Sequence, residues 1–171
     1  MKQLGLWEDI HVPEENKQIE KAVFELFVDG ASKHNPGPAG AGFVIMKNKE
    51  IICRQGFYLG KKTNNQAEYY GLLIGIFFLK KYIQKNDSFT IVSDSQLLVR
   101  QMNGEYKVRD AQLKMLKDLI VLWLQEYSYK VVHVLREYNR FADEMANRGV
   151  EQKIFVPQEI LQILKNHDIT L

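Results

Sequence analysis

Two apolar segments of this chain, each long enough for one strand, end in an aspartate. Residues 24–28 lead to Asp29, and residues 89–93 lead to Asp94. A buried strand seldom ends in a carboxylate without a use for it, because a charge at the edge of a core loses hydration. In sheets with parallel strands, ligands gather at the carboxyl ends of the strands. These two positions therefore favour a fold that brings two strand ends together at one site.

Apolar periodicity predicts three meandering strands followed by helices that alternate with strands. The expected order is β-β-β-α-β-α-α-β-α-α, with strands at residues 23–29, 42–46, 51–58, 89–93 and 129–135 and helices at residues 65–82, 95–102, 111–125, 139–149 and from Pro157 onward. The turn-forming residues 35–40 are expected to join the first two strands. This order predicts an α/β fold, a five-stranded mixed sheet flanked by helices.

Helix starts and faces also follow from the pattern. Asp110 and Asn139 are suitable N-cap residues for the helices that follow them. Within residues 65–82, one face is expected to be apolar and to turn toward the core. The residues that share this face are Ala67, Tyr70, Gly71, Ile74 and Phe78.

Composition limits the class of protein. With 171 residues, 46% apolar and 26% charged, the chain is expected to form one globular domain. Its longest apolar stretch, residues 72–79, is far shorter than the ~20 residues that span a bilayer, and residues 1–10 lack the apolar segment of a secretory signal. The expected compartment is the cytoplasm, with no membrane partner. Cys53 is the only cysteine, which excludes an internal disulfide and a cysteine-based zinc cluster.

Four acidic residues in separate motifs are the candidate functional groups: Asp29, Glu68, Asp94 and Asp143. Glu68 and Asp143 fall in the first turns of predicted helices, where the helix dipole favours an acid, so each alone has an ordinary explanation. All four together would repel one another and raise their own pKa values unless a cation neutralised them. Hard oxygen ligands of this kind suit Mg²⁺ or Mn²⁺ and do not select zinc.

The four motifs resemble those of ribonuclease H of the type 1 class. They are residues 29–32 (DGAS) with 35–40 (NPGPAG), residues 63–69 (TNNQAEY), residues 93–96 (SDSQ), and residues 136–139 (REYN) with 142–147 (ADEMAN). The resemblance covers roughly residues 23–149. It implies a ribonuclease H-like fold and an endonuclease that hydrolyses the RNA strand of RNA/DNA hybrids with two Mg²⁺ ions, or Mn²⁺, leaving 5′-phosphate and 3′-hydroxyl ends.

The resemblance also implies a role for individual residues. Asp29 would bridge both ions, Asp143 would complete the shell of one, and Glu68 and Asp94 that of the other. A second set would bind the hybrid, with Thr63 in a DNA phosphate pocket and the 2′-hydroxyl of RNA as the group to be recognised. The members of that set are Asn35, Thr63, Asn64, Asn65, Ser95 and Gln96. Helix capping is a sufficient alternative reason for one of residues 63–65.

Two departures from the family's bacterial members are visible. The chain passes directly through residues 103–108 where those enzymes carry a basic handle, so affinity for the hybrid would be lower or supplied elsewhere. The loop before Asp143 lacks the histidine that many members use in product release, and Arg136 or Glu137 would substitute for it. The expected organisation is an N-terminal extension at residues 1–21, a catalytic domain at 22–150 and a C-terminal helical extension at 151–171, in a monomer.

Two other functions compete with hybrid cleavage. The first is a non-catalytic module that binds nucleic acid or protein on the same fold, and the complete carboxylate set argues against it. The second is another two-metal nuclease of the same architecture. Residues 63–65 (TNN) and 94–96 (DSQ) favour hybrid cleavage over that alternative.

Overall fold

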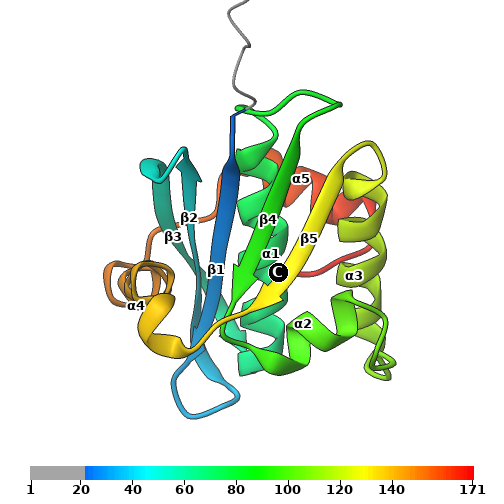
Figure 1. Ribbon diagram of the computed structural model, residues 1–171. Helices are drawn as coiled ribbons and strands as arrows, with labels where there is room; N and C mark the ends of the chain where they lie inside the picture. The colour runs from blue at the N-terminus through cyan, green and yellow to red at the C-terminus, as the bar shows by residue number, and fades with distance from the viewer. Residues whose placement is uncertain (1–21) are drawn as a thin grey trace, which may run out of the picture.

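The computed structural model describes residues 22–171, so the predicted N-terminal extension lies outside the described residues. Five strands form one sheet in the order β3-β2-β1-β4-β5 (Figure 1). The antiparallel strands are β1 (Phe24–Ser32), β2 (Gly37–Lys47) and β3 (Glu50–Lys62), and β4 (Ser88–Ser93) and β5 (Ser128–His133) continue the sheet in parallel with β1. The predicted mixed sheet and its element order are confirmed.

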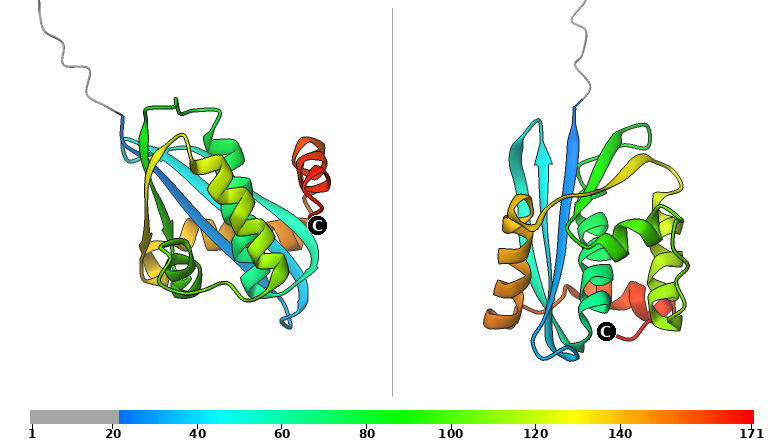
Figure 2. Two further views of the ribbon diagram at one scale, coloured as in Figure 1. Left: turned by 90° about the vertical axis from the view of Figure 1, so that its right-hand side faces the viewer. Right: turned by 60° about the horizontal axis from the view of Figure 1, so that its bottom comes forward.

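Helices cover both faces of the sheet (Figure 2, left). They are α1 (Asn64–Leu79), α2 (Gln96–Met102), α3 (Ala111–Leu124), α4 (Arg140–Gln152) and α5 (Gln158–Asn166), with a 3-10 helix η1 (Arg136–Tyr138) before α4. Successive side chains of β2 point to opposite faces of the sheet and contact different helices. Phe43 stacks on Phe78 of α1, with ring centroids 5.0 Å apart, whereas Val44 packs against Ala142 and Met145 of α4. Asp110 caps α3 as predicted, accepting a hydrogen bond from the Leu113 amide.

Helix α1 is buried on more than one face. The predicted apolar face is buried or half-buried, but so are Leu72, Leu73 and Ile76, which lie on other sides of the helix. The reason is that α1 packs against β1 and β2 on one side and α3 on another. A helix enclosed in this way is apolar nearly all round. The prediction of a single core-facing stripe was therefore too narrow. Within residues 22–171, no helix is long and apolar enough to cross a membrane.

The connection between β1 and β2 is shorter than predicted. Residues 37–40 belong to β2, and only residues 33–36 form the turn. A turn was expected because glycine and proline are common in turns. Here the small residues serve packing instead: a carbon added at Gly40 would lie 2.2 Å from the Ala146 carbonyl oxygen of α4. A bulge between Pro38 and Gly40 accommodates the proline.

The C-terminal helix α5 packs on the main core. Ile160 and Leu164 belong to the same cluster of buried residues as the sheet and α1. The Tyr70 hydroxyl of α1 donates a hydrogen bond of 2.8 Å to the Thr170 carbonyl. Through these contacts the C-terminal segment contributes to the core of the domain.

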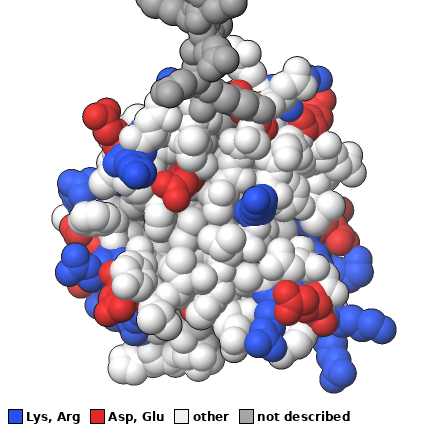
Figure 3. Space-filling view, in the orientation of Figure 1, with Lys and Arg blue, Asp and Glu red and all other residues white. Residues whose placement is uncertain are grey.

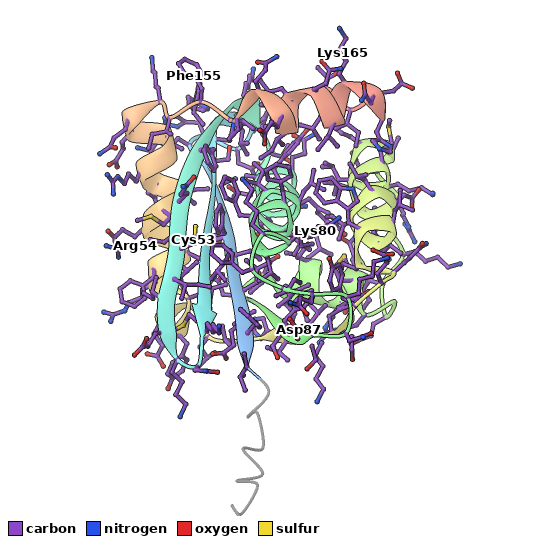
Figure 4. The ribbon with its side chains drawn as sticks, turned by 90° about the horizontal axis from the view of Figure 1, so that it is seen from above. Cys53, Arg54, Lys80, Asp87, Phe155 and Lys165 are labelled. Atoms are coloured by element: carbon purple, nitrogen blue, oxygen red, sulfur yellow. The ribbon has the colours of Figure 1, made fainter. Side chains whose placement is uncertain are left out.

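Replacing Ile160 by alanine is expected to lower the free energy of unfolding by about 2–5 kcal/mol, because Ile160 is fully buried and the change leaves a cavity. Denaturant unfolding followed by circular dichroism measures the loss. Lys165→Ala is the matched control on the same helix, since Lys165 points away from the domain (Figure 4) and its removal should change stability by less than about 0.5 kcal/mol. Equal effects of the two substitutions would contradict docking of α5 through Ile160.

Candidate active site

The four candidate acids line one open cavity of about 360 Å³. It lies at the edge of the sheet toward which β1, β4 and β5 run, the edge that comes forward in the right-hand view of Figure 2. The acidic residues are Asp29 of β1, Glu68 of α1, Asp94 after β4 and Asp143 of α4, and the other lining residues are Gly30, Ala31, Ser32, Lys33, Asn64, Arg136 and Asn147. Four elements far apart in the sequence thus contribute one carboxylate each.

Asp29 lies inside β1 rather than at its end. β1 pairs with β2 as far as Ser32, but its parallel pairing with β4 stops where Phe27 lies opposite Val92. The two strands separate beyond this pair, and Asp29 and Asp94 each follow two residues later. The expectation that Asp29 ends its strand was wrong. The carboxylate nevertheless lies where the sheet forks, which gives it access to the cavity.

A close contact between β1 and α1 brings Glu68 toward Asp29. A carbon added at Gly30 would lie 2.1 Å from the Glu68 amide nitrogen and 2.2 Å from the Ala67 carbonyl carbon, so glycine alone permits this approach. The start of α1 is held by a capping box: Thr63 Oγ1 accepts from the Gln66 amide at 3.2 Å, and Gln66 Oε1 accepts from the Thr63 amide at 2.9 Å. Capping is therefore an observed role of Thr63.

Three of the four carboxylates accept a hydrogen bond from a neighbouring side chain. Ser95 Oγ donates to Glu68 Oε2 at 2.5 Å. Asn139 Nδ2 donates to Asp94 Oδ1 at 2.7 Å, and Arg136 forms an ion pair of 2.9 Å with Asp143 Oδ1. These contacts fix one oxygen of each carboxylate.

Burial and mutual repulsion perturb the two innermost acids. Burial raises the pKa of Asp29 to about 8, and the charges of Asp94, Asp143 and Glu68 add to this effect while a hydrogen bond from the Gly30 backbone opposes it. Burial likewise raises the pKa of Glu68 to about 7, opposed by the Ser95 hydrogen bond and assisted by Asp94. Asp29 is thus the carboxylate that senses all three others.

The chemistry of these residues fits divalent cations. Carboxylate oxygens are the ligands that Mg²⁺ and Mn²⁺ prefer, and a cation would relieve the repulsion that raises the pKa of Asp29. Among residues 22–171, no three acidic, histidine or cysteine side chains are already close enough together to hold an ion. Glu68, Asp94 and Asp143 instead use an oxygen each on Ser95, Asn139 and Arg136.

Without divalent ions, the protein is expected to lose stability as the pH rises from about 4 to 8. The pKa of Asp29 is raised from 3.8 to about 8 on folding, so the folded state holds a proton that the unfolded state has released in this range. One unit of pKa corresponds to about 1.4 kcal/mol, so the loss at pH 8 is on the order of a few kcal/mol. Thermal unfolding in EDTA across this range measures it.

Asp29→Asn should reduce that pH dependence, because asparagine does not titrate. Part of it should remain, because the pKa of Glu68 is also raised on folding, to about 7. Mg²⁺ should restore stability at pH 8 in the unmodified protein more than in Asp29→Asn, since ligands that bind only the folded state stabilise it. An identical pH profile for both proteins in EDTA would contradict the assignment of the raised pKa to Asp29.

The predicted substrate-binding residues surround the cavity, but only Asn64 lines it. Asn64 Oδ1 accepts from the Ser32 amide, and Asn35 Oδ1 accepts from the Asn64 amide, both at 2.9 Å, so the two asparagines join the β1–β2 turn to α1. Ser95 caps α2 through the Leu98 amide. The starts of α1 and α2 carry the remaining members, Thr63, Asn65 and Gln96, which do not line the cavity. Glu137 of η1 is exposed and does not line the cavity either.

Five lining residues were not predicted to be part of the site: Gly30, Ala31, Ser32, Lys33 and Asn147. Gly30, Ala31 and Ser32 belong to the first motif, and Lys33 directly follows it. Asn147 ends the last motif, one helical turn after Asp143, whose carbonyl accepts a hydrogen bond from Asn147 Nδ2 at 2.9 Å. The available signal for Asn147 was its i+4 spacing from Asp143, which places both on one face of α4. Lys33 had no signal beyond its position in the sequence.

Fold and site together define a ribonuclease H-like domain, with an acidic cavity at the fork of a five-stranded mixed sheet. Residues 27–149 match the family model described as "Reverse transcriptase-like". The chain belongs to this family, and within it is related to ribonuclease HI.

Individual relatives agree with this placement. Ribonuclease HI of Halobacterium salinarum is 32% identical over 73% of this chain and 63% of its own length. A bifunctional protein of Mycobacterium tuberculosis is 34% identical over 77% of this chain and 36% of its own length, so the chain spans less than two thirds of either relative. The solved structure of LC11-RNase H1 in complex with RNA/DNA hybrid has a TM-score of 0.69 and 34% identity, covering 77% of this chain and 98% of that one.

Proposed function

We propose that this protein hydrolyses the RNA strand of RNA/DNA hybrids as a metal-dependent endonuclease that leaves 5′-phosphate and 3′-hydroxyl ends. The observation that carries the proposal is the convergence of four carboxylates from four elements on one cavity, where the charges of the other three all raise the pKa of Asp29. A relative of 34% identity that was solved with an RNA/DNA hybrid supports the choice of substrate.

Asp29, Glu68, Asp94 and Asp143 would hold two divalent ions, with Asp29 shared between them. Such ions, when bound, activate a water and stabilise the leaving oxygen at the scissile phosphate. The protein's own part is to hold the carboxylates oriented and close together, and the bound cations would favour the ionised form of Asp29 and Glu68, which burial disfavours. Arg136 is proposed as the auxiliary group of the loop before α4, because its guanidinium reaches Asp143 and lines the cavity. Glu137 has no such contact with the cavity.

Substrate recognition is assigned to the starts of α1 and α2. Asn64, Asn65 and Gln96 would contact the minor groove, Thr63 a DNA phosphate, and Asn35 and Ser95 would support these positions. Charged side chains gather at the lower right of Figure 3, with acidic groups among the Lys and Arg, where Figure 1 places the connection between α2 and α3. That connection contains Lys107 and Arg109 together with Glu105 and Asp110, so its basic side chains would replace only a small part of the charge that a basic handle provides in other members.

The experiment is to incubate the purified protein with a labelled RNA/DNA hybrid and with matched RNA and DNA duplexes, in Mg²⁺, in Mn²⁺ and in EDTA. Loss of the RNA strand of the hybrid alone, only with divalent ions, is the expected result, and the fragment ends can be identified by their response to phosphatase and ligase. Asp94→Asn serves as the variant that should bind the hybrid without cutting it. Hybrid binding without cleavage in either ion would favour the non-catalytic module.

A further inference from the structure

Asn139 is a buried polar residue at the back of the candidate active site. Its side chain is 1% exposed, so it cannot touch a nucleic acid bound in the cavity. One nitrogen, Nδ2, donates to two acceptors: Asp94 Oδ1 at 2.7 Å and the Val28 carbonyl oxygen at 2.9 Å. A single amide group therefore connects the residue before Asp29 with Asp94.

The place of this amide is explained by the fork in the sheet. Parallel pairing of β1 with β4 ends where Phe27 lies opposite Val92, so the Val28 carbonyl lies just beyond the last paired residues. Asn139 provides a donor for this carbonyl and at the same time bonds Asp94 on the other strand. Because Asn139 is also the residue directly before α4, the same side chain is connected to the helix that carries Asp143.

Helix capping does not account for this residue. Asn139 occupies the N-cap position of α4, as the sequence predicts, but its side chain makes no capping hydrogen bond. Its Oδ1 is buried and has no hydrogen-bond partner among the described residues, which costs free energy. Rotating the amide by half a turn would face Oδ1 toward two acceptors, Asp94 Oδ1 and the Val28 carbonyl. The two hydrogen bonds that Nδ2 donates thus hold the amide in one orientation.

We propose that Asn139 is a positioning residue that fixes the Asp94 carboxylate, and the spacing between β1 and β4, for binding of a divalent ion. With Oδ1 of Asp94 held by Asn139, Oδ2 is left to face the cavity as a ligand. This inference rests on the proposed function, because it assigns Asp94 to the metal site. Partners that orient a metal ligand in this way usually affect metal affinity or activity by about 10–100-fold when they are removed.

The direct test is Asn139→Ala, with Mn²⁺ binding measured on the protein without substrate by electron paramagnetic resonance of the free ion. The dissociation constant for Mn²⁺ should rise by roughly 10-fold or more, and kcat for hybrid cleavage should fall by about 10–100-fold. KM for the hybrid should stay within about twofold, because Asn139 is shielded from the substrate. Mn²⁺ affinity and kcat both within twofold of the unmodified protein would overturn the proposal.

A general loss of stability is separated from positioning by Ile160→Ala, which disturbs the core through α5. Compared at a temperature where both variants are folded, Ile160→Ala should retain Mn²⁺ affinity and kcat, and Asn139→Ala should not. Equal losses of Mn²⁺ affinity and kcat in the two variants would mean that Asn139 only stabilises the fold, and would overturn the proposal.

The contact itself can be tested even if Asn139→Ala folds poorly. In Asn139→Asp, two carboxylates face each other, and adding Asp94→Asn restores a donor and acceptor pair. Asp94→Asn should therefore raise the melting temperature in EDTA more in the Asn139→Asp background than in the unmodified protein, and equal shifts would overturn the contact. Mn²⁺ binding and this double-mutant comparison do not require cleavage of a substrate, so they test the role of Asn139 even if the protein does not cleave hybrid. Absence of cleavage would refute the proposed function, not the contact between Asn139 and Asp94.

Discussion

Replacing Asp29 by asparagine is expected to lower the rate of hybrid cleavage by roughly a thousandfold or more while the protein stays folded. Asp29 is buried at the fork of the sheet, and its pKa is raised first by burial and then by the charges of all three other acids, as expected of a ligand shared by two ions. Asparagine has the same shape but carries no charge for a cation. Removal of one preorganised group in an active site commonly costs about 100- to 1000-fold, and a ligand shared by two ions should lie at or above that range.

The rate is measured under single-turnover conditions with saturating Mg²⁺, and hybrid affinity is measured in parallel by fluorescence anisotropy. Affinity should be retained, since the loss of one negative charge does not oppose binding of a phosphate backbone. Asp87→Asn is the matched control and should cleave like the unmodified protein. Asp87, labelled in Figure 4, lies in the loop that follows the C-terminal end of α1, whereas Glu68 lies near the N-terminal end of that helix. Cleavage by Asp29→Asn at the control rate would remove Asp29 from the metal site.

The acidic residues could be found from the sequence because their signal is local. Asp29 and Asp94 each interrupt an apolar run, which predicted that two strand ends meet at one site, and the structure places β1 and β4 side by side in the sheet. The resemblance of four motifs then connected Glu68 and Asp143 with them. Each of these signals is contained in a short stretch of about a dozen consecutive residues or fewer, a range over which periodicity and motif spacing are informative.

Features that depend on contacts between distant segments were missed or misjudged. Residues 37–40 have the composition of a turn, yet they extend β2 because α4 needs small residues beneath it. Asn139 looks like a helix cap, but its amide is used 111 positions away on the Val28 carbonyl. In both cases a tertiary contact overrides a local preference, and such contacts leave no periodic pattern in a single sequence.

Gly30 is the clearest case of a residue whose role depends on a tertiary contact, because its place in the sequence does not show what it does in the structure. In the sequence it is one letter of a motif and a common turn former. In the structure it lies within β1, where an added carbon would lie 2.1 Å from the Glu68 amide nitrogen, far inside normal contact distances. The absence of a side chain is therefore what allows Glu68 and Asp29 to share one cavity.

Gly30→Ala is accordingly expected to lower the free energy of unfolding by about 3 kcal/mol or more, since the clash is with helix backbone that cannot rotate away. In molecules that remain folded, α1 must shift outward with Glu68, and a displacement of about 1 Å can cost about 100-fold in rate. Urea unfolding measures the first effect, and single-turnover cleavage below the melting temperature the second.

Gly104→Ala separates the steric effect from the loss of a glycine. Gly104 has φ of +78°, and a carbon added there meets no described atom within 4 Å, so only backbone strain of about 1–2 kcal/mol is expected, with cleavage unchanged. If Gly30→Ala lost no more stability than Gly104→Ala and cleaved at the normal rate, close contact between β1 and α1 would not be needed for the site. If only Gly30→Ala lost both stability and cleavage rate, the absence of a side chain at position 30 would be required both for the packing of α1 on β1 and for the geometry of the carboxylates.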